Sequence, residues 1–270
     1  MAVTEANEEL TRSLAKIRGT QPVARNTAGG GALLAELFEV CRAWSDEQTL
    51  DDLKEKAEHS EILRKPAFET RKRVWRSLRN RYLETGCDWS VRVFRDSARA
   101  GAASAEFVSL AYLYFALRDR LTFDFVIKSI WLKWNQHQVN VDQGEFLGFL
   151  NGEAQQFSEI EKWTENTRKK LARNTLSALR DFGLLQGSRK KKIQRPAVAS
   201  EIVFHLVCIL LAEGLEGRSV IEAPDWRLFL WTVDDVSQSL GELAQLGWIR
   251  YERGGRMVIL QLQRQPGDRA

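Results

Sequence analysis

Four consecutive cations, Arg189, Lys190, Lys191 and Lys192, follow a glycine-bounded apolar pair in the stretch FGLLQGSRKKKIQRP, residues 182–196. Such a run can be a solvated loop, a targeting signal or a tip that binds phosphates. A targeting signal belongs in a flexible tail, whereas a phosphate-binding tip connects ordered elements. The sequence on either side of the run therefore decides between the three interpretations.

The preceding stretch, TENTRKKLARNTLSALRDF at residues 164–182, has the periodicity of an amphipathic helix. Its opposite sides are apolar and cationic. The cationic side carries side chains that can bind phosphates or base edges: Asn166, Lys169, Lys170, Arg173, Ser177 and Arg180. Arginine offers paired donors to guanine edges or phosphates, while lysine and serine mainly hold phosphates. Because Arg189–Lys192 and Arg195 extend this stripe, we predict one phosphate-binding surface along both elements.

The net charge of +4 is unevenly distributed along the chain. Residues 162–195 carry eleven Lys or Arg against two acids, and residues 64–99 carry eleven against four, so the remainder is acidic. Two basic segments in an acidic chain favour surfaces for a polyanion. Ordinary solvated helix faces are the alternative for both. The segment 64–99 gives a possible second DNA patch, formed by Arg71, Lys72, Arg76 and Arg79.

The chain has 270 residues, of which 44% are hydrophobic and 28% charged, a composition typical of globular proteins. Its three cysteines are far apart and odd in number, which favours a reducing compartment over a disulfide scaffold. We recognise no secretory signal at its start. The longest apolar run, residues 202–212, is shorter than the roughly 20 residues that span a bilayer. We therefore expect a cytoplasmic protein with no membrane partner.

Helical periodicity interrupted by glycine stops predicts a mainly α, multi-helix globular protein with helix-turn-helix or winged-helix elements and short β-hairpin wings. The expected units are a flexible tail over residues 1–30, a helical bundle over 31–138, a first helix-turn-helix or winged-helix unit over 139–198, a C-terminal winged-helix-like unit over 199–264, and a tail over 265–270.

Two segments of the chain share one layout. In each, a long helix ends at a glycine, Gly183 or Gly247, and an apolar pair and a strand or hairpin follow directly. The second hairpin has Gly254-Gly255 between alternating strands, which is a strong hairpin signal. A last helix that runs into a short hairpin is typical of a winged helix. Generic packing of a helix on a hairpin is the alternative.

The sequence offers few residues for catalysis. The histidines His59, His137 and His205 lack partner motifs, and we find no CxxC, HExxH, P-loop or GxSxG sequence. The glycines before Ala32 follow no expected strand, so they make a poor phosphate-binding loop. Asp234 and Asp235 are better explained as charges at a helix N-terminus than as a pair of metal ligands. We therefore predict a protein that is not an enzyme, with no catalytic residue, no metal site and no cofactor.

Three blocks of the sequence resemble a known family. They are TRKKLARNTLSALRDFGLLQG, APDWRLFLWTVDDV and GWIRYERGGRMVIL, and the likeness extends from about residue 32 to 262. Together they are similar to the A component of bacteriophage-exclusion (BREX) defence systems, sometimes labelled a putative inner membrane protein. The resemblance implies a small, soluble, mainly helical DNA-binding accessory protein in a bacterial cytoplasm, working beside an adenine methyltransferase. It brings no catalytic residues, and we expect Asp225 and Arg227 of the second block to form a structural pair.

These observations give one leading prediction and one rival. The leading prediction is non-enzymatic binding of double-stranded DNA, mainly through phosphate contacts of basic helix-turn-helix surfaces, within a BREX system. The rival is an adaptor that assembles other defence proteins through its basic faces. RNA binding is a third possibility, disfavoured because the sequence shows no aromatic stacking platform.

Overall fold

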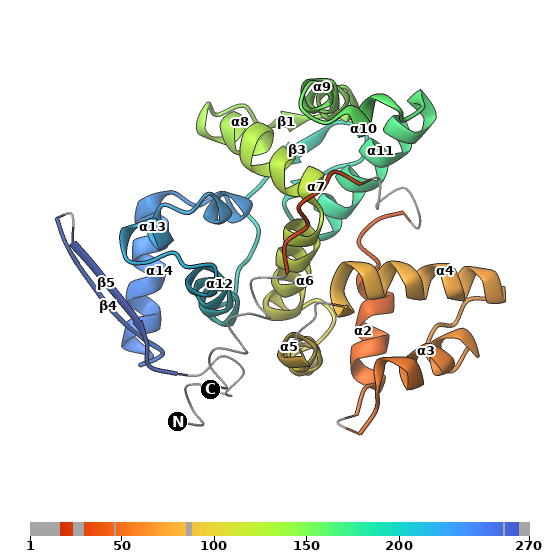
Figure 1. Ribbon diagram of the computed structural model, residues 1–270, viewed down its shortest axis with the longest axis horizontal. Helices are drawn as coiled ribbons and strands as arrows, with labels where there is room; N and C mark the ends of the chain where they lie inside the picture. The colour runs from red at the N-terminus through yellow and green to blue at the C-terminus, as the bar shows by residue number, and fades with distance from the viewer. Residues whose placement is uncertain (1–16, 24–29, 46, 85–87, 256, 265–270) are drawn as a thin grey trace.

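The computed structural model describes residues 17–23, 30–45, 47–84, 88–255 and 257–264. Figure 1 shows three groups of elements arranged around one central helix, α6 (Ala105–Arg118). The described chain is mainly helical, and its strands form two small antiparallel sheets. The prediction of a mainly α protein with short β-hairpins is confirmed.

The first group comprises the N-terminal helices. They are α2 (Leu34–Ala43), α3 (Leu50–Glu58), α4 (Phe68–Leu78), the π-helical turn η2 (Arg79–Leu83) and α5 (Asp88–Ala98). Helix α3 begins at a reciprocal capping box, in which Thr49 accepts from the Asp52 amide and Asp52 accepts from the Thr49 amide. Helix α4 buries Val74, Trp75 and Leu78, so its basic residues lie on the opposite side.

Helix α6 is apolar around its whole circumference, and a helix of that kind must be buried. Its aromatic rings contact elements from all three groups. Phe107 packs on Phe38 of α2, with ring centroids 5.6 Å apart, and Phe115 packs on Phe182 at 5.1 Å. The Tyr112 hydroxyl donates to the carbonyl of Leu228, 2.9 Å away. The core therefore runs through α6 from one group to the others.

The second group follows α6 directly. It contains α7 (Arg120–Phe125), η3 (Val126–Ile130), α8 (Trp131–Asn135), β1 (Asn140–Val141), α9 (Gln143–Ala154), α10 (Ser158–Glu161), α11 (Glu165–Asp181), β2 (Leu185–Gln186) and β3 (Lys191–Ile193). Its strands lie in the order β1-β3-β2, and both pairs are antiparallel. Strand β1 therefore closes the outer edge of the β2–β3 hairpin.

The third group repeats the succession of helices and hairpin. It contains α12 (Ser200–Ala212), α13 (Arg218–Ile221), the 3₁₀ turn η4 (Pro224–Phe229), α14 (Val233–Gln245), β4 (Ile249–Gly254) and β5 (Met257–Leu262). Helices α11 and α14 end alike: Gly183 and Gly247 have φ of +81° and +71°, and the next residue donates back to the carbonyl five positions earlier. Glycine is favoured at both positions because a side chain there would be strained.

Part of the expected tail is packed into the fold. Ile17 is buried, and Arg18 forms ion pairs with Glu213, at 2.5 Å, and Asp225, at 2.6 Å. A Cβ atom at Gly19 would lie 2.3 Å from a backbone oxygen of Arg118. The prediction of a flexible tail over residues 1–30 is therefore wrong for residues 17–23, because their contacts come from segments far along the chain. Residues 1–16, 24–29 and 265–270 lie outside the described residues.

The same contacts correct a smaller prediction. Asp225 pairs with Arg18 rather than with the expected Arg227.

Within the part of the chain that the structure describes, no helix has the length and apolar character needed to cross a bilayer.

His205 should make the stability of the protein depend on pH. It is buried in α12 with Nε2 2.9 Å from the Tyr114 hydroxyl, and burial lowers its pKa to about 3. Below about pH 6.5 this histidine binds a proton in the unfolded chain but not in the folded one. As the pH falls from about 6.5 to about 3, the free energy of unfolding should therefore decrease by up to about 1.4 kcal/mol per pH unit.

The variant His205→Gln is neutral throughout this range and should lose this part of the pH dependence. Urea unfolding of both proteins at pH 7 and pH 5 measures it. The prediction concerns the change between the two pH values, so an overall destabilisation of the variant does not affect it. Equal changes in both proteins would contradict it.

Candidate nucleic-acid interface

Helix α11 has one core side and one solvent side. It begins at Thr164, whose hydroxyl accepts from the Thr167 amide at 3.2 Å. Its core side buries Leu171, Ala172 and Leu179 along with neighbouring residues. Asn174 and Thr175 are buried too, and the side of the helix that carries Asn166, Lys170 and Arg173 faces solvent.

The first half of α11 borders a shallow groove of about 530 Å³. The groove is lined by polar and cationic residues: Gln143, Asn166, Thr167, Lys169, Lys170 and Arg173. Lys169 lies 2.5 Å from the carboxylate of Glu165, which offsets its charge. Lys170 and Arg173 are exposed, and no acidic side chain in the described part of the chain pairs with either. Both cations are thus available to a ligand in the groove.

Two residues of this groove, Gln143 and Thr167, are not among those that the sequence predicts for the interface. Gln143 enters it from α9, where its side-chain amide donates to the carbonyl of Lys169 at 3.2 Å. No local pattern could place a residue of α9 beside α11, because the two helices meet only through the tertiary packing. Thr167 could have been found, since it follows the Thr164 cap on the exposed first turn.

The end of α11 is fixed by the segment before α2. Asp181 accepts the Ala32 amide at 3.1 Å with one carboxylate oxygen and the Arg180 guanidinium at 2.9 Å with the other. Gly31 has φ of +76°, and a Cβ atom there would lie 2.6 Å from Asp181 Oδ2. The glycines before α2 therefore allow a close approach to α11. Arg180, which also lies 3.3 Å from the half-buried Ser177 hydroxyl, is partly neutralised.

The β2–β3 hairpin divides the basic run into free and bound cations. Arg189, Lys190 and Lys192 are exposed, and within the described ranges none has an ion-pair partner. Lys191 points inward: it is buried, and its ammonium donates to the carbonyl of Ser188 at 2.6 Å. Burial and the neighbouring Arg180 lower the pKa of Lys191. The sequence predicts all four residues at the surface, but the alternation of side chains along a strand turns Lys191 into the fold.

Gly187 shapes the tip of this hairpin. Its φ is +103°, and a Cβ atom at this position would lie 2.8 Å from the carbonyl oxygen of Lys190. The tight turn thus depends on glycine, and it sets the directions of the cations that follow.

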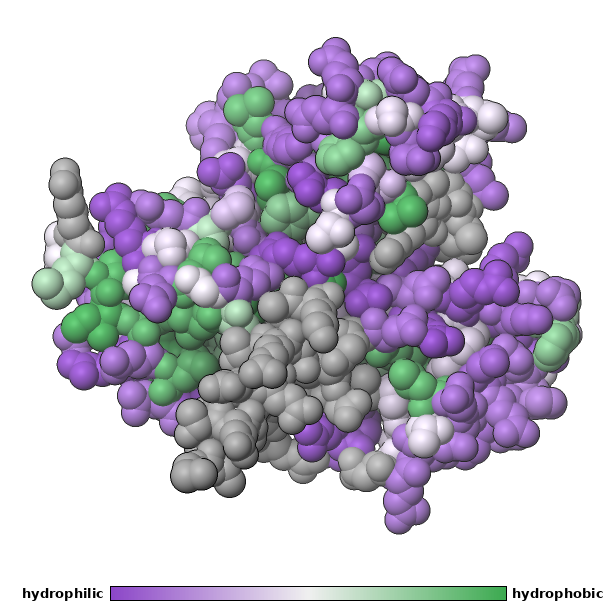
Figure 2. Space-filling view, viewed as in Figure 1, coloured by the Kyte–Doolittle hydropathy of each residue, from purple (hydrophilic) through white to green (hydrophobic). Residues whose placement is uncertain are grey.

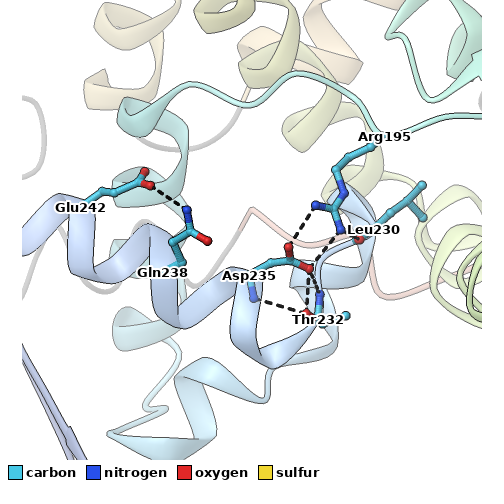
Figure 3. Close-up of polar contacts among 6 residues, drawn as sticks. All are labelled: Arg195, Leu230, Thr232, Asp235, Gln238 and Glu242. Atoms are coloured by element: carbon cyan, nitrogen blue, oxygen red, sulfur yellow. Dashed lines mark hydrogen bonds and ion pairs between the residues drawn. The ribbon is translucent and has the colours of Figure 1, made fainter.

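Arg195 holds the second and third groups of elements together. Its two terminal nitrogens each lie 3.0 Å from a carboxylate oxygen of Asp235, and one of them also donates to the carbonyl of Leu230 at 3.1 Å (Figure 3). Asp235 also caps α14 through Thr232, and these bonds lower its pKa against the opposing effect of burial. The expected phosphate contact of Arg195 is therefore replaced by a structural ion pair, whose partner lies 40 residues away.

The expected second patch, which lies on α4 and the first residue of η2, is divided in the same way. Arg71 donates to the carbonyls of Glu58 at 2.6 Å and Lys65 at 2.7 Å, so it braces the connection from α3 to α4. Arg79 pairs with Glu84 at 2.7 Å. Lys72 and Arg76 remain exposed, as does Arg73, which lies outside the predicted patch.

The free cations of α11 and its hairpin form one candidate interface. They are Lys170, Arg173, Arg189, Lys190 and Lys192, together with the exposed amide of Asn166. Figure 2 shows the outer surface over α9–α11 as largely hydrophilic. The corresponding face of α14 exposes Asp234 and Glu242 instead.

In residues 17–23, 30–45, 47–84, 88–255 and 257–264, no three His, Cys, Asp or Glu side chains form a group that could hold a metal ion.

Comparison with known proteins supports the sequence resemblance. Residues 25–208 match the model of a protein family described as BrxA. The match covers more than half of the chain and includes α11, the β2–β3 hairpin and most of α12. A comparison with curated proteins gave no match.

The ion pair of Arg195 and Asp235 should contribute to stability. A double-mutant cycle with Arg195→Met and Asp235→Asn isolates their coupling from the capping role of Asp235. We expect about 0.5–1 kcal/mol from urea unfolding, because the pair is bidentate but partly exposed. A second cycle on the exposed i,i+4 pair Arg218 and Glu222 gives the reference for a surface contact. Coupling no larger than in that reference would contradict the assignment.

Proposed function

Because the chain belongs to the BrxA family, a component of BREX bacteriophage-exclusion systems, we propose that it is a non-enzymatic accessory protein of such a system that binds double-stranded DNA. One observation carries the proposal. Five exposed cations on α11 and the β2–β3 hairpin have no counter-charge in the described part of the chain, although acids are plentiful elsewhere. Cations gathered on one surface without counter-charges favour a polyanionic ligand.

The arrangement of the elements supports duplex DNA as that ligand. Helix α11 follows two shorter helices and runs into a hairpin whose outer edge is closed by β1. This succession supports a winged helix-turn-helix, in which the last helix would enter the major groove and the hairpin would lie on the backbone. A straight cationic helix beside a cationic hairpin suits a groove flanked by phosphates.

The contacts can be assigned from exposure. Lys170 and Arg173, with Asn166, would face the groove of the DNA, because they lie on the solvent side of α11. Arg189, Lys190 and Lys192 would lie on flanking phosphates. Lys191, Arg195 and the partly neutralised Arg180 would support these residues rather than bind DNA, since their charges are already bound within the fold. Other BREX proteins, such as the adenine methyltransferase, are candidate partners.

The triple variant Arg189→Ala, Lys190→Ala, Lys192→Ala should weaken binding to unrelated duplex sequences alike. Each lost phosphate contact lowers the slope of log affinity against log salt by about 0.9, so the slope should decrease by about two to three. Fluorescence anisotropy with random-sequence duplexes over a range of salt concentrations measures it. The control variant replaces Lys54, Lys56 and Arg92, which lie on α3 and α5, with alanine. Equal slopes for wild type and triple variant would refute the hairpin contact.

Arg173→Ala should lower the affinity for duplex DNA by about tenfold, because the lost guanidinium is exposed and lines the groove. The matched variant Arg195→Ala should change affinity much less, since that guanidinium is bound to Asp235. Thermal unfolding of both variants separates loss of binding from loss of fold. A larger effect of Arg195→Ala on affinity at equal folded fraction would overturn the assignment.

A further inference from the structure

Helix α4 carries a second group of free cations, which the DNA-binding proposal leaves unused. Lys72, Arg73 and Arg76 are exposed on the side opposite the buried residues of the helix. Within the described ranges, no carboxylate forms an ion pair with any of the three. The helix itself contains a single acid, Glu69, in its first turn. Exposed cations with so little counter-charge favour a polyanionic ligand.

The segment before α2 lies alongside the cationic side of α11. A Cβ atom at Gly30 would lie 3.6 Å from Oδ1 of Asn174. A Cβ atom at Gly31 would lie 3.8 Å from the Ser177 hydroxyl oxygen. Ser177 is one helical turn beyond the exposed Arg173, so this segment borders the candidate interface rather than lying behind it.

The same segment is bound on its other side by η2, which continues α4 without a break. The Arg81 guanidinium donates to the carbonyl of Gly31 at 3.0 Å, and the Tyr82 hydroxyl donates to the carbonyl of Ala32 at 2.6 Å. The Ala32 amide in turn donates to Asp181 at the end of α11. Because Arg81 and Tyr82 are buried, these bonds are shielded from water and hold α4 in a fixed position beside α11.

The β2–β3 hairpin meets α11 at this same end. The Lys191 ammonium is close enough to Arg180 and Asp181 for both charges to act on it, with opposite effects on its pKa. Figure 1 shows α4 and α11 on the same side of α6, with the group of α12–α14 on the other side. The cationic hairpin, the end of α11 and the end of α4 therefore meet around Asp181.

We propose that a DNA duplex bound on α11 and its hairpin extends onto α4, where Lys72, Arg73 and Arg76 bind its phosphates. The inference rests on the proposed DNA binding and adds a second contact region to it. A duplex carries phosphates along its whole length, at one charge per about 1.7 Å of its axis, so a cationic surface beside the first site can contact the same molecule. Once the first site is occupied, the second contact gains from the high local concentration of the bound duplex.

The α4 surface suits DNA better than an acidic protein partner. Stable protein interfaces have an apolar centre around which charged pairs are arranged. The large apolar side chain exposed on α4 is Phe68, and its ring already packs against the Arg71 guanidinium, which lies 5.9 Å from the ring centroid. Figure 2 shows the viewed surface over α4 as largely hydrophilic, as it is over α9–α11.

The salt dependence of binding to a random-sequence duplex of about 30 base pairs, about 100 Å long, tests the proposal. The triple variant Lys72→Ala, Arg73→Ala, Arg76→Ala should lower the slope of log affinity against log salt by about two to three, because each lost phosphate contact removes about 0.9. Combined with the triple variant of the hairpin, it should lower the slope by about five, since both regions contact one duplex. Sedimentation velocity with labelled duplex in excess should show no complex of one protein with two duplexes.

The control variant Lys54→Ala, Lys56→Ala, Arg92→Ala removes the same charge from α3 and α5 and should keep the wild-type slope. Circular dichroism of each variant verifies its fold. An unchanged slope of the α4 variant, or an equal decrease in the control, would overturn this inference.

Two outcomes separate this inference from the proposal on which it rests. If the hairpin variant lowers the slope and the α4 variant does not, binding at α11 stands and only the extension onto α4 is overturned. A complex of one protein with two duplexes would also overturn the extension alone, because the two regions would then be separate sites. A wild type that binds no duplex at low salt would refute the proposed function and this inference with it.

Discussion

The burial of α6 is the constraint on which the rest of the structure depends. A helix that is apolar on every side gains free energy only when other elements cover it completely, at about 25 cal/mol per Å² of apolar surface. Phe107 packs against Phe38 of α2, while Tyr112 and Phe115 pack against Phe182. Tyr114 contacts His205 of α12. The three groups of elements thus share one core and are held in fixed positions relative to one another.

This core also orients the cationic surface. Phe182 lies directly after α11 and packs against α6, so the opposite side of the helix must face solvent. Gly183 then ends the helix and Gly187 turns the hairpin, which carries the basic tip. The N-terminal part of the chain also holds α11 in place, because Asp181 accepts a hydrogen bond from the segment before α2. The exposed cations therefore stand on a rigid support, as a binding surface requires.

The second and third groups have the same succession of elements but opposite surface charge. Helix α11 exposes Lys170 and Arg173, whereas α14 exposes Asp234 and Glu242. The ion pair of Arg195 with Asp235 joins the two groups without exposing a free charge. Similar backbones can thus bind different partners, because the core residues determine the fold while the solvent-side residues determine which ligand is bound. In our proposal the first surface binds DNA.

The amino-acid sequence by itself determined the fold class, helix α11 and both hairpins, because periodicity and glycine stops are local signals. It also placed Lys170 and Arg173 on the solvent side of their helix. Only the tertiary structure decided which cations are free. Lys191 and Arg195 look equivalent to their neighbours in sequence, yet each is bound to oxygen atoms within the fold. Arg18 likewise anchors an expected tail through acids about 200 residues away. Periodicity tells which side of a helix is buried, but the partner of a charge comes from wherever the folded chain brings an opposite charge or a carbonyl.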